Sequence, residues 1–216
     1  MRFILASSSP ARLTIMRSAG IEPLVRVSHV DEDALLNRRR AHAGFLEPSE
    51  TVLELAQAKC EAVASALPQV PLTELEDGAL VVGCDSMLEF NGEIMGKPHT
   101  PDEATARWQS MRGKRGTLHT GHWVVRLDSA GTAVDAVGAV SSTDVWFAHL
   151  SDEEIHAYVA SEEPLHVAGA FTIDGLGGPF IDRIEGDHHG VIGLSLPLMR
   201  TLTLSLGVPW HSLWNR

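Results

Sequence analysis

Hydroxyl and cationic side chains gather close to the N-terminus, directly after a short apolar run. Three serines, a proline and Arg12 follow residues 3–5, and Pro10 starts a helix that we expect to end at Gly20. A serine just ahead of Pro10 can cap that helix, so that backbone N–H groups and the positive helix end face the loop. Ser7, Ser9 and Arg12 therefore have the composition of a phosphate-binding loop. An ordinary capped turn has the same pattern.

Two acidic positions could supply a metal ligand or a proton acceptor. Asp85 and Ser86 end a continuous apolar strand over residues 79–86, and α/β enzymes hold catalytic groups at such strand ends. The alternative is an aspartate that caps the next turn. Glu32 lies in an acidic loop after a strand predicted over residues 21–27. The two carboxylates suit a hard divalent cation.

Two lysines could neutralise an anionic ligand near these acids. Lys59 falls on the apolar stripe of a helix that Ser49 or Thr51 begins, with Glu54 completing a capping box. It either extends to the surface along that stripe or points into a cleft. Lys97 stands between a glycine and a proline, which leaves its backbone little freedom to lose on binding.

The rest of the pattern predicts alternating helices and strands. The predicted elements are a hairpin turn at Asn91-Gly92, a helix over 101–111, strands over 120–127 and up to about 149, a helix over 151–160, a strand over 180–184, a turn over 186–190 and a closing helix that ends at Gly207. Residues 37–47 lack a clean period and predict a surface loop, and residues 68–78 predict a polar linker.

Composition limits the classes of function. A chain of 216 residues, 44% of them hydrophobic, can bury a core as one domain or two joined lobes. The net charge of −11 argues against a broad basic surface for nucleic acid. Two cysteines, no apolar run of membrane-spanning length and no signal-peptide pattern lead us to expect a cytoplasmic protein without a membrane partner. The His119/His122 and His188/His189 pairs lack a third ligand at a recognisable spacing.

Several short motifs together resemble the Maf family. They are residues 5–12, 30–32, 56–59, 83–86, 96–98, 120–121, 168–171 and 191–194, in the order in which that family has them. The resemblance covers nearly the whole chain and implies a single Maf-like domain over residues 1–216. It implies a two-lobed α/β fold, related to that of the inosine triphosphate pyrophosphatases, with a long mixed sheet flanked by helices and a central cleft.

The same resemblance implies chemistry. Maf proteins hydrolyse a nucleoside triphosphate to the monophosphate and pyrophosphate with a divalent metal, Mg²⁺ or Mn²⁺. The family's serine–arginine loop corresponds to Ser7, Ser9 and Arg12, its acidic loop to Glu32, its two lysines to Lys59 and Lys97, and its proposed general base to Asp85. From the chemistry of the carboxylates we expect Glu32 and Asp85 to be the metal ligands. The expected substrate-binding set is Ser7, Ser9, Arg12, Lys59, Ser86, Lys97 and Asp174. The expected partner is a nucleoside triphosphate, and formation of a homodimer stays open.

Two departures from the family pattern affect the substrate. The first loop has Ala11 where the family often has a second arginine, so a phosphate contact is either missing or supplied by Arg17 or the run 38–40. Asp174 stands where branches of the family have glutamine or glutamate. An ionised aspartate only accepts hydrogen bonds, so it favours guanine or cytosine over uracil. The alternative is that Asp174 merely caps the turn at Gly175.

A second class of function stays in view. The family was first associated with inhibition of septum formation, so the chain could be a nucleotide-responsive regulator of cell division in which turnover is incidental. The two hypotheses differ in whether loss of the Asp85 carboxylate abolishes the biological effect while nucleotide binding persists. We favour the enzyme because a pure binding site has no need for a carboxylate and a metal at the scissile phosphate.

Overall fold

The computed structural model describes residues 1–44, 47–67 and 77–215, which form an α/β fold around one mixed sheet. The sheet has the strand order β2-β1-β3-β5-β6-β7, and β4 pairs with β3. The strands are β1 (Arg2–Leu5), β2 (Leu24–Val25), β3 (Ala79–Phe90), β4 (Glu93–Met95), β5 (Arg115–Leu127), β6 (Ala133–Phe147) and β7 (Ile181–Glu185). The α-helices are α1 (Pro10–Ser18), α2 (Glu32–Ala43), α3 (Pro48–Ala66), α4 (Pro101–Met111), α5 (Asp152–Ala160), α6 (His188–Ile192) and α7 (Leu196–Ser205).

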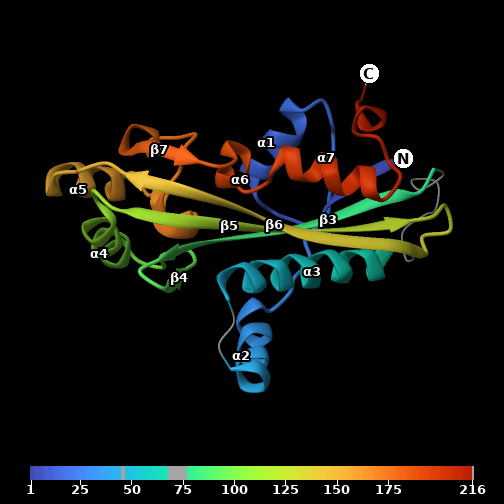
Figure 1. The fold of residues 1–216 in the computed structure, drawn as a ribbon, viewed down its shortest axis with the longest axis horizontal. Helices are drawn as coiled ribbons and strands as arrows, with labels where there is room; N and C mark the ends of the chain where they lie inside the picture. Colours follow the sequence, from blue (N-terminus) through green and yellow to red (C-terminus); the bar gives the residue numbers. More distant parts are fainter. Residues whose placement is uncertain (45–46, 68–76, 216) are drawn as a thin grey trace.

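Three long antiparallel strands connect the two ends of the molecule. In Figure 1, β3, β5 and β6 run along its length, with α3 on one face and α1, α6 and α7 on the other. The helices α4 and α5 lie at the opposite end from the two termini. One apolar cluster joins α1 and α7 to the sheet, a second lies under α3, and a third, rich in aromatic rings, fills the end with α4 and α5. The expected two-lobed arrangement on a long mixed sheet is confirmed.

The edge of β3 is only partly covered. On one side, β5 pairs with β3 along residues 79–89. On the other side, β1 pairs with residues 79–82 and β4 with residues 88–90. Residues 83–87 therefore have no strand partner on that side within the described part of the chain. We call this stretch the β3 opening. It lies at the carboxyl end of β1, where open α/β sheets bind their ligands.

Elements with strong local signals form where the sequence predicts them. Helix α4 has the predicted bounds, and Thr100 caps it by accepting the N–H of Glu103. Helix α5 has the predicted capping box, in which Ser151 and Glu154 exchange hydrogen bonds. The hairpin turn carries positive φ angles of 52° at Asn91 and 79° at Gly92, the conformation for which this dipeptide is favoured.

Two segments predicted as irregular are helical instead. Most of residues 37–47 belongs to α2, which begins at Glu32. That helix exposes charged residues on most sides, so it has no apolar period to detect, but the Asp31 carboxylate accepts the N–H of Ala34 at 2.9 Å and starts it. Likewise, the predicted turn over 186–190 contains α6, whose first turn is capped by the Asp187 carboxylate.

Two boundaries also differ. Helix α3 begins at Pro48, one turn before the predicted capping box, so Thr51 is inside the helix and bonds back to the Glu47 carbonyl. Strand β5 begins at Arg115 rather than at residue 120, because β6 pairs with it from Arg115 and β3 pairs with it from Thr117. Of the predicted linker, residues 68–76 lie outside the described residues. No helix in the described segments is long and apolar enough to cross a bilayer.

Candidate active site

Arg12 is the centre of the first cluster at the β3 opening. It lies in the first turn of α1, and its buried guanidinium donates four hydrogen bonds to protein atoms. Nε donates to the Gly193 carbonyl at 2.7 Å, Nη1 to Ser7 Oγ at 3.1 Å and to the Cys84 carbonyl at 2.8 Å, and Nη2 to Ser86 Oγ at 3.1 Å. Arg12 thus joins the serine loop, β3 and the end of α6, and one N–H on Nη2 is left for a ligand.

The hydroxyls beside Arg12 form a short chain. Ser86 Oγ lies 2.9 Å from Thr120 Oγ1, which donates to the Gly190 carbonyl at 2.8 Å. Ser9 caps α1 by accepting the N–H of Arg12, as expected of a serine ahead of Pro10. The same loop is therefore held by the helix cap and by the guanidinium.

Lys59 joins the two predicted acids. It projects from α3, and its Nζ lies 2.5 Å from Asp85 Oδ1 and 2.8 Å from Glu32 Oε1. Its side chain is only 12% exposed, so it points into the β3 opening rather than out to solvent. The second oxygen of Asp85, Oδ2, is buried and has no hydrogen-bond partner. A buried polar atom without a partner costs free energy unless a ligand or water satisfies it.

The protonation of Asp85 reflects both burial and charge. Burial raises the pKa of this carboxyl above its ordinary value, and the positive charges of Lys59 and Arg12 oppose that shift. The carboxylate is thus a stronger proton acceptor than one in water, a property suited to a general base.

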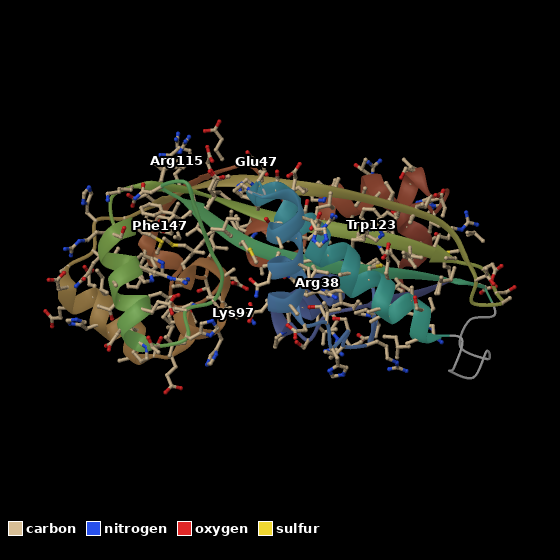
Figure 2. The ribbon with its side chains drawn as sticks, turned by 90° about the horizontal axis from the view of Figure 1, so that it is seen from below. Arg38, Glu47, Lys97, Arg115, Trp123 and Phe147 are labelled. Carbon is tan, nitrogen blue, oxygen red and sulfur yellow. The ribbon has the colours of Figure 1, made fainter. Side chains whose placement is uncertain are left out.

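Lys97 and Asp174 belong to the other lobe. The side chain of Lys97 is exposed and makes no hydrogen bond or ion pair with the described residues. Figure 2 shows it at the edge of the α4–α5 lobe that faces α2. Asp174 is also exposed. The structure brings Ser7, Arg12 and Ser86 together, and Lys59 with Glu32 and Asp85, but it records no contact of Lys97 or Asp174 with either group.

Two of the candidate substitutes for the arginine absent at Ala11, Arg17 and Arg39, are paired with glutamates. Arg17 is exposed and pairs with Glu22, with Nε 2.9 Å from Oε2. Arg39 pairs with Glu54 on α3. Arg38 is exposed on α2 and donates from Nε to the Ala34 carbonyl. Of these side chains, only that of Arg38 has no carboxylate partner among the described residues, and Arg40 has no described side chain.

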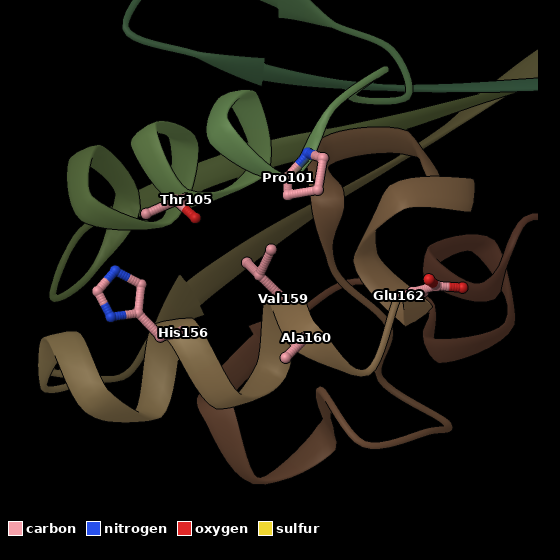
Figure 3. Close-up of a pocket in the computed structure, with 6 residues that line it drawn as sticks. All are labelled: Pro101, Thr105, His156, Val159, Ala160 and Glu162. Atoms are coloured by element: carbon pink, nitrogen blue, oxygen red, sulfur yellow. The ribbon is translucent and has the colours of Figure 1, made fainter.

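The cavity shown in Figure 3 lies away from these clusters. It has a volume of about 300 Å³ and lies between α4 and α5, lined by Pro101, Thr105, His156, Val159, Ala160 and Glu162. None of the predicted site residues lines it. The cavity therefore contributes nothing to the assignment of the reactive groups.

A buried histidine, which the sequence analysis considered only as a metal ligand, supports Arg12. His122 Nε2 accepts the N–H of Ser195 at 2.8 Å, so its Nδ1 carries the proton and donates to the Thr120 carbonyl at 3.0 Å. These two hydrogen bonds hold in place the segment whose Gly193 carbonyl accepts from Arg12 Nε. The sequence motif offered only a histidine spacing, and the partner at Ser195 is 73 residues away.

This arrangement predicts acid instability. Burial, together with the charge of Arg12, lowers the pKa of His122 from 6.5 to about 4. The unfolded chain therefore binds more protons than the folded chain between those pH values. Above pH 6.5, His122 has no effect on the pH dependence of stability, and as the pH falls to 4 it should lower the free energy of unfolding by about 3 kcal/mol. Urea unfolding at pH 7, 5.5 and 4 would measure this. His122→Asn should flatten the pH dependence, and an unchanged slope would contradict the assignment.

Comparison with known proteins shows the family of this chain. A family model described as Maf-like protein matches residues 2–205. The chain belongs to the Maf family. The expected family membership and fold class are confirmed.

Similar Maf proteins extend over the whole chain. A protein of Leifsonia xyli subsp. xyli is 50% identical over 216 residues, covering 100% of this chain and 98% of its own. One from Nocardia farcinica is 51% identical over 98% of this chain and 96% of its own. One from Streptomyces coelicolor is 52% identical over 99% of this chain and 94% of its own. All three carry the name nucleoside triphosphate pyrophosphatase.

In the described parts of the chain, no third side chain joins Asp85 and Glu32 to complete a metal site. Among the described residues, no group of three or more histidine, cysteine, aspartate or glutamate side chains could hold an ion. Asp85 and Glu32 remain as a pair, with the ammonium group of Lys59 between them. Two carboxylates with a buried free oxygen fit Mg²⁺, which usually binds through one or two carboxylates, substrate phosphates and water.

Proposed function

We propose that the β3 opening binds a nucleoside triphosphate and that Asp85 activates the water that cleaves it between the α- and β-phosphates. The products are the nucleoside monophosphate and pyrophosphate, as the name of the full-length relatives implies. The observation that carries the mechanism is the buried Oδ2 of Asp85, which has no hydrogen-bond partner. The positive charges of Lys59 and Arg12 act on the same carboxyl group.

Each group has a task in an in-line displacement. The water loses its proton to Asp85 Oδ2 as its oxygen bonds to the α-phosphorus, and the bond to the bridging oxygen breaks. Lys59 holds Oδ1, which leaves Oδ2 for the water. The remaining N–H of Arg12, the Ser7 and Ser9 hydroxyls and Lys97 neutralise or bind phosphate oxygens. Ser86 maintains the position of Arg12 by accepting from its Nη2, and its own hydroxyl proton goes to Thr120 Oγ1, because Thr120 donates to the Gly190 carbonyl.

Asp85 and Glu32 are the carboxylates that would hold a divalent ion at the β3 opening. When bound by Asp85 and Glu32, Mg²⁺ or Mn²⁺ would neutralise charge on the phosphates and orient them. The ammonium group of Lys59 already lies against both carboxylates, so those carboxylates are placed to hold a cation.

Release of pyrophosphate tests the activity. Nucleoside triphosphates incubated with the protein and Mg²⁺ or Mn²⁺ should yield one pyrophosphate per monophosphate, and chelation of the metal should stop the reaction. Release of inorganic phosphate with a nucleoside diphosphate would place the cleavage at the other anhydride bond. Absence of any turnover with every base would overturn the proposal.

Base preference should follow Asp174. Its carboxylate can accept from the N1–H and N2–H₂ groups of guanine, and a cationic 7-methylguanine adds attraction. We expect guanine nucleotides to have the highest kcat/KM in a panel of GTP, 7-methyl-GTP, CTP, UTP and dTTP. Asp174→Gln, which offers a donor as well as an acceptor, should shift the ranking toward UTP and dTTP. A native preference for uracil or thymine, or an unchanged ranking in the variant, would remove Asp174 from base recognition.

A further inference from the structure

The loop that carries Asp174 is wrapped around a second carboxylate, that of Glu163. Glu163 begins the short 3-10 helix η3 (Glu163–His166), just after α5. Its Oε1 accepts hydrogen bonds from Thr172 Oγ1 at 2.5 Å, from the Gly177 N–H at 3.0 Å and from Tyr158 Oη at 3.1 Å. Its Oε2 accepts the N–H of Leu176 at 3.0 Å. These four donors include both ends of the loop over residues 172–177.

The approach of the loop is close enough to require glycine. A Cβ on Gly175 would lie 2.6 Å from Glu163 Oε2, and one on Gly177 would lie 2.4 Å from Tyr158 Oη. Tyr158 also accepts the N–H of Thr172 at 3.2 Å. The loop is thus fitted to this carboxylate and this phenol by both its backbone and its side chains.

Charge and protonation are consistent with a permanent anion at this position. Burial acts to raise the pKa of Glu163, but the hydrogen bonds from Thr172, Leu176, Gly177 and Tyr158 outweigh it and hold the pKa below its ordinary value. Glutamate is therefore ionised across the neutral range. Only a carboxylate accepts at both oxygens, since an amide would turn one of them into a donor.

The same loop is connected to the segment that carries Lys97, in the same lobe. The 3-10 helix η4 (Ala168–Ala170) precedes it, and the Gly169 N–H donates to the carbonyl of Gly96, next to Lys97. Asp174 lies between the two tethered ends and is itself exposed. It therefore has a fixed backbone and a carboxylate available to a ligand.

We propose that Glu163 is a positioning residue that holds the 172–177 loop in place and thereby sets the base preference through Asp174. The inference rests on the proposed function, because Asp174 reads the base there. Because the loop is already ordered in the free protein, less conformational entropy is lost when the substrate binds. Released from Glu163, the glycine-containing loop would present Asp174 in many positions, and recognition of the base would weaken while the phosphate contacts stay.

A double-mutant cycle on base selectivity tests the inference. The variants are Glu163→Gln, Asp174→Ala and their combination, with Glu153→Gln on the exposed side of α5 as the matched control. Glu163→Gln should lower kcat/KM for the preferred nucleotide about tenfold, mainly through KM, and change it less than about twofold for ribose 5′-triphosphate, which lacks a base. The Leu176 and Gly177 amides should exchange faster with deuterium, and Glu153→Gln should change nothing.

The outcomes separate the two proposals. In the Asp174→Ala background, Glu163→Gln should leave base selectivity unaltered, because its effect acts through Asp174. If Glu163→Gln lowers activity equally for ribose 5′-triphosphate, or still changes selectivity without Asp174, the positioning role is overturned. If Asp174→Ala changes selectivity and Glu163→Gln does not, the positioning inference alone fails. If Asp174→Ala leaves selectivity intact, base reading by Asp174 fails, and the inference fails with it.

A second variant guards against a folding defect in the first. Gly175→Ala keeps both carboxylates but places a methyl group against Glu163 Oε2. It should reduce base selectivity in the same direction as Glu163→Gln, with ribose 5′-triphosphate again the unaffected substrate. Native selectivity in a folded Gly175→Ala protein would overturn the inference.

Discussion

Replacement of Asp85 by asparagine should lower kcat by about two to four orders of magnitude, the usual contribution of a general base. The amide has the same shape but cannot take a proton from water. Lys59 would keep Glu32 as a partner at 2.8 Å, so the opening should hold its form. Turnover of the preferred nucleotide, with Mg²⁺ at saturation, gives the measurement.

Binding and pH dependence make this result specific to catalysis. A substrate analogue with a methylene bridge between the α- and β-phosphates should bind Asp85→Asn with nearly native affinity. Because burial raises the pKa of Asp85, the native enzyme should lose activity on the acid side at a higher pH than an ordinary carboxylate would give. Asp144→Asn is the matched control, since Asp144 is a partly buried aspartate paired with Arg115. Near-native turnover in Asp85→Asn would exclude Asp85 as the base.

Replacement of Arg12 by alanine should damage both stability and activity. The buried carbonyls of Gly193 and Cys84 lose their donor, which we expect to cost about 3 kcal/mol in total. For a chain of this size, that cost corresponds to a Tm lower by about 6–12 °C. If Arg12 binds the phosphates as proposed, loss of its charge should also reduce kcat/KM about ten- to a hundredfold, measured at a temperature where the variant is folded.

Two other cations show which part of the effect belongs to folding. Lys97→Ala removes an exposed ammonium group without a partner among the described residues, so kcat/KM should fall to a similar extent with little change in Tm. Arg17→Ala, on the same helix as Arg12 but exposed and paired with Glu22, should leave both quantities unchanged. Arg12→Lys should not recover the Tm, because one ammonium group cannot reach four acceptors. A native Tm for Arg12→Ala would contradict the role of Arg12 in holding the serine loop, β3 and the end of α6 together.

The comparison of Arg12 with Lys97 also refines the sequence-based hypothesis. Both were predicted as phosphate cations, and that prediction stays untested for each. The structure shows that Arg12 uses four donors to hold three segments together, whereas Lys97 uses none on the described protein. The same sequence pattern, a cation beside a loop, thus corresponds to a buried guanidinium with four hydrogen bonds at Arg12 and to an exposed ammonium group at Lys97.

Local chemistry in the sequence determined several elements directly. The bounds of α4, the capping box of α5 and the Asn91-Gly92 turn depend on residues within one turn of each other. The motif order also sufficed to identify the family. These signals can be read without the fold because the groups that satisfy each backbone amide are neighbours in the chain.

Tertiary structure decided the rest. Helix α2 has no apolar face to reveal it, and the first residues of β5 form a strand because β3 and β6 flank them. The Arg12 bond to Gly193 spans 181 positions, the Lys59 bond to Asp85 spans 26, and Glu163 is defined only by the loop folded onto it. No residue pattern specifies such pairs, since they depend on which strand edges stay open and which side chains the packing of the whole sheet brings within hydrogen-bonding distance.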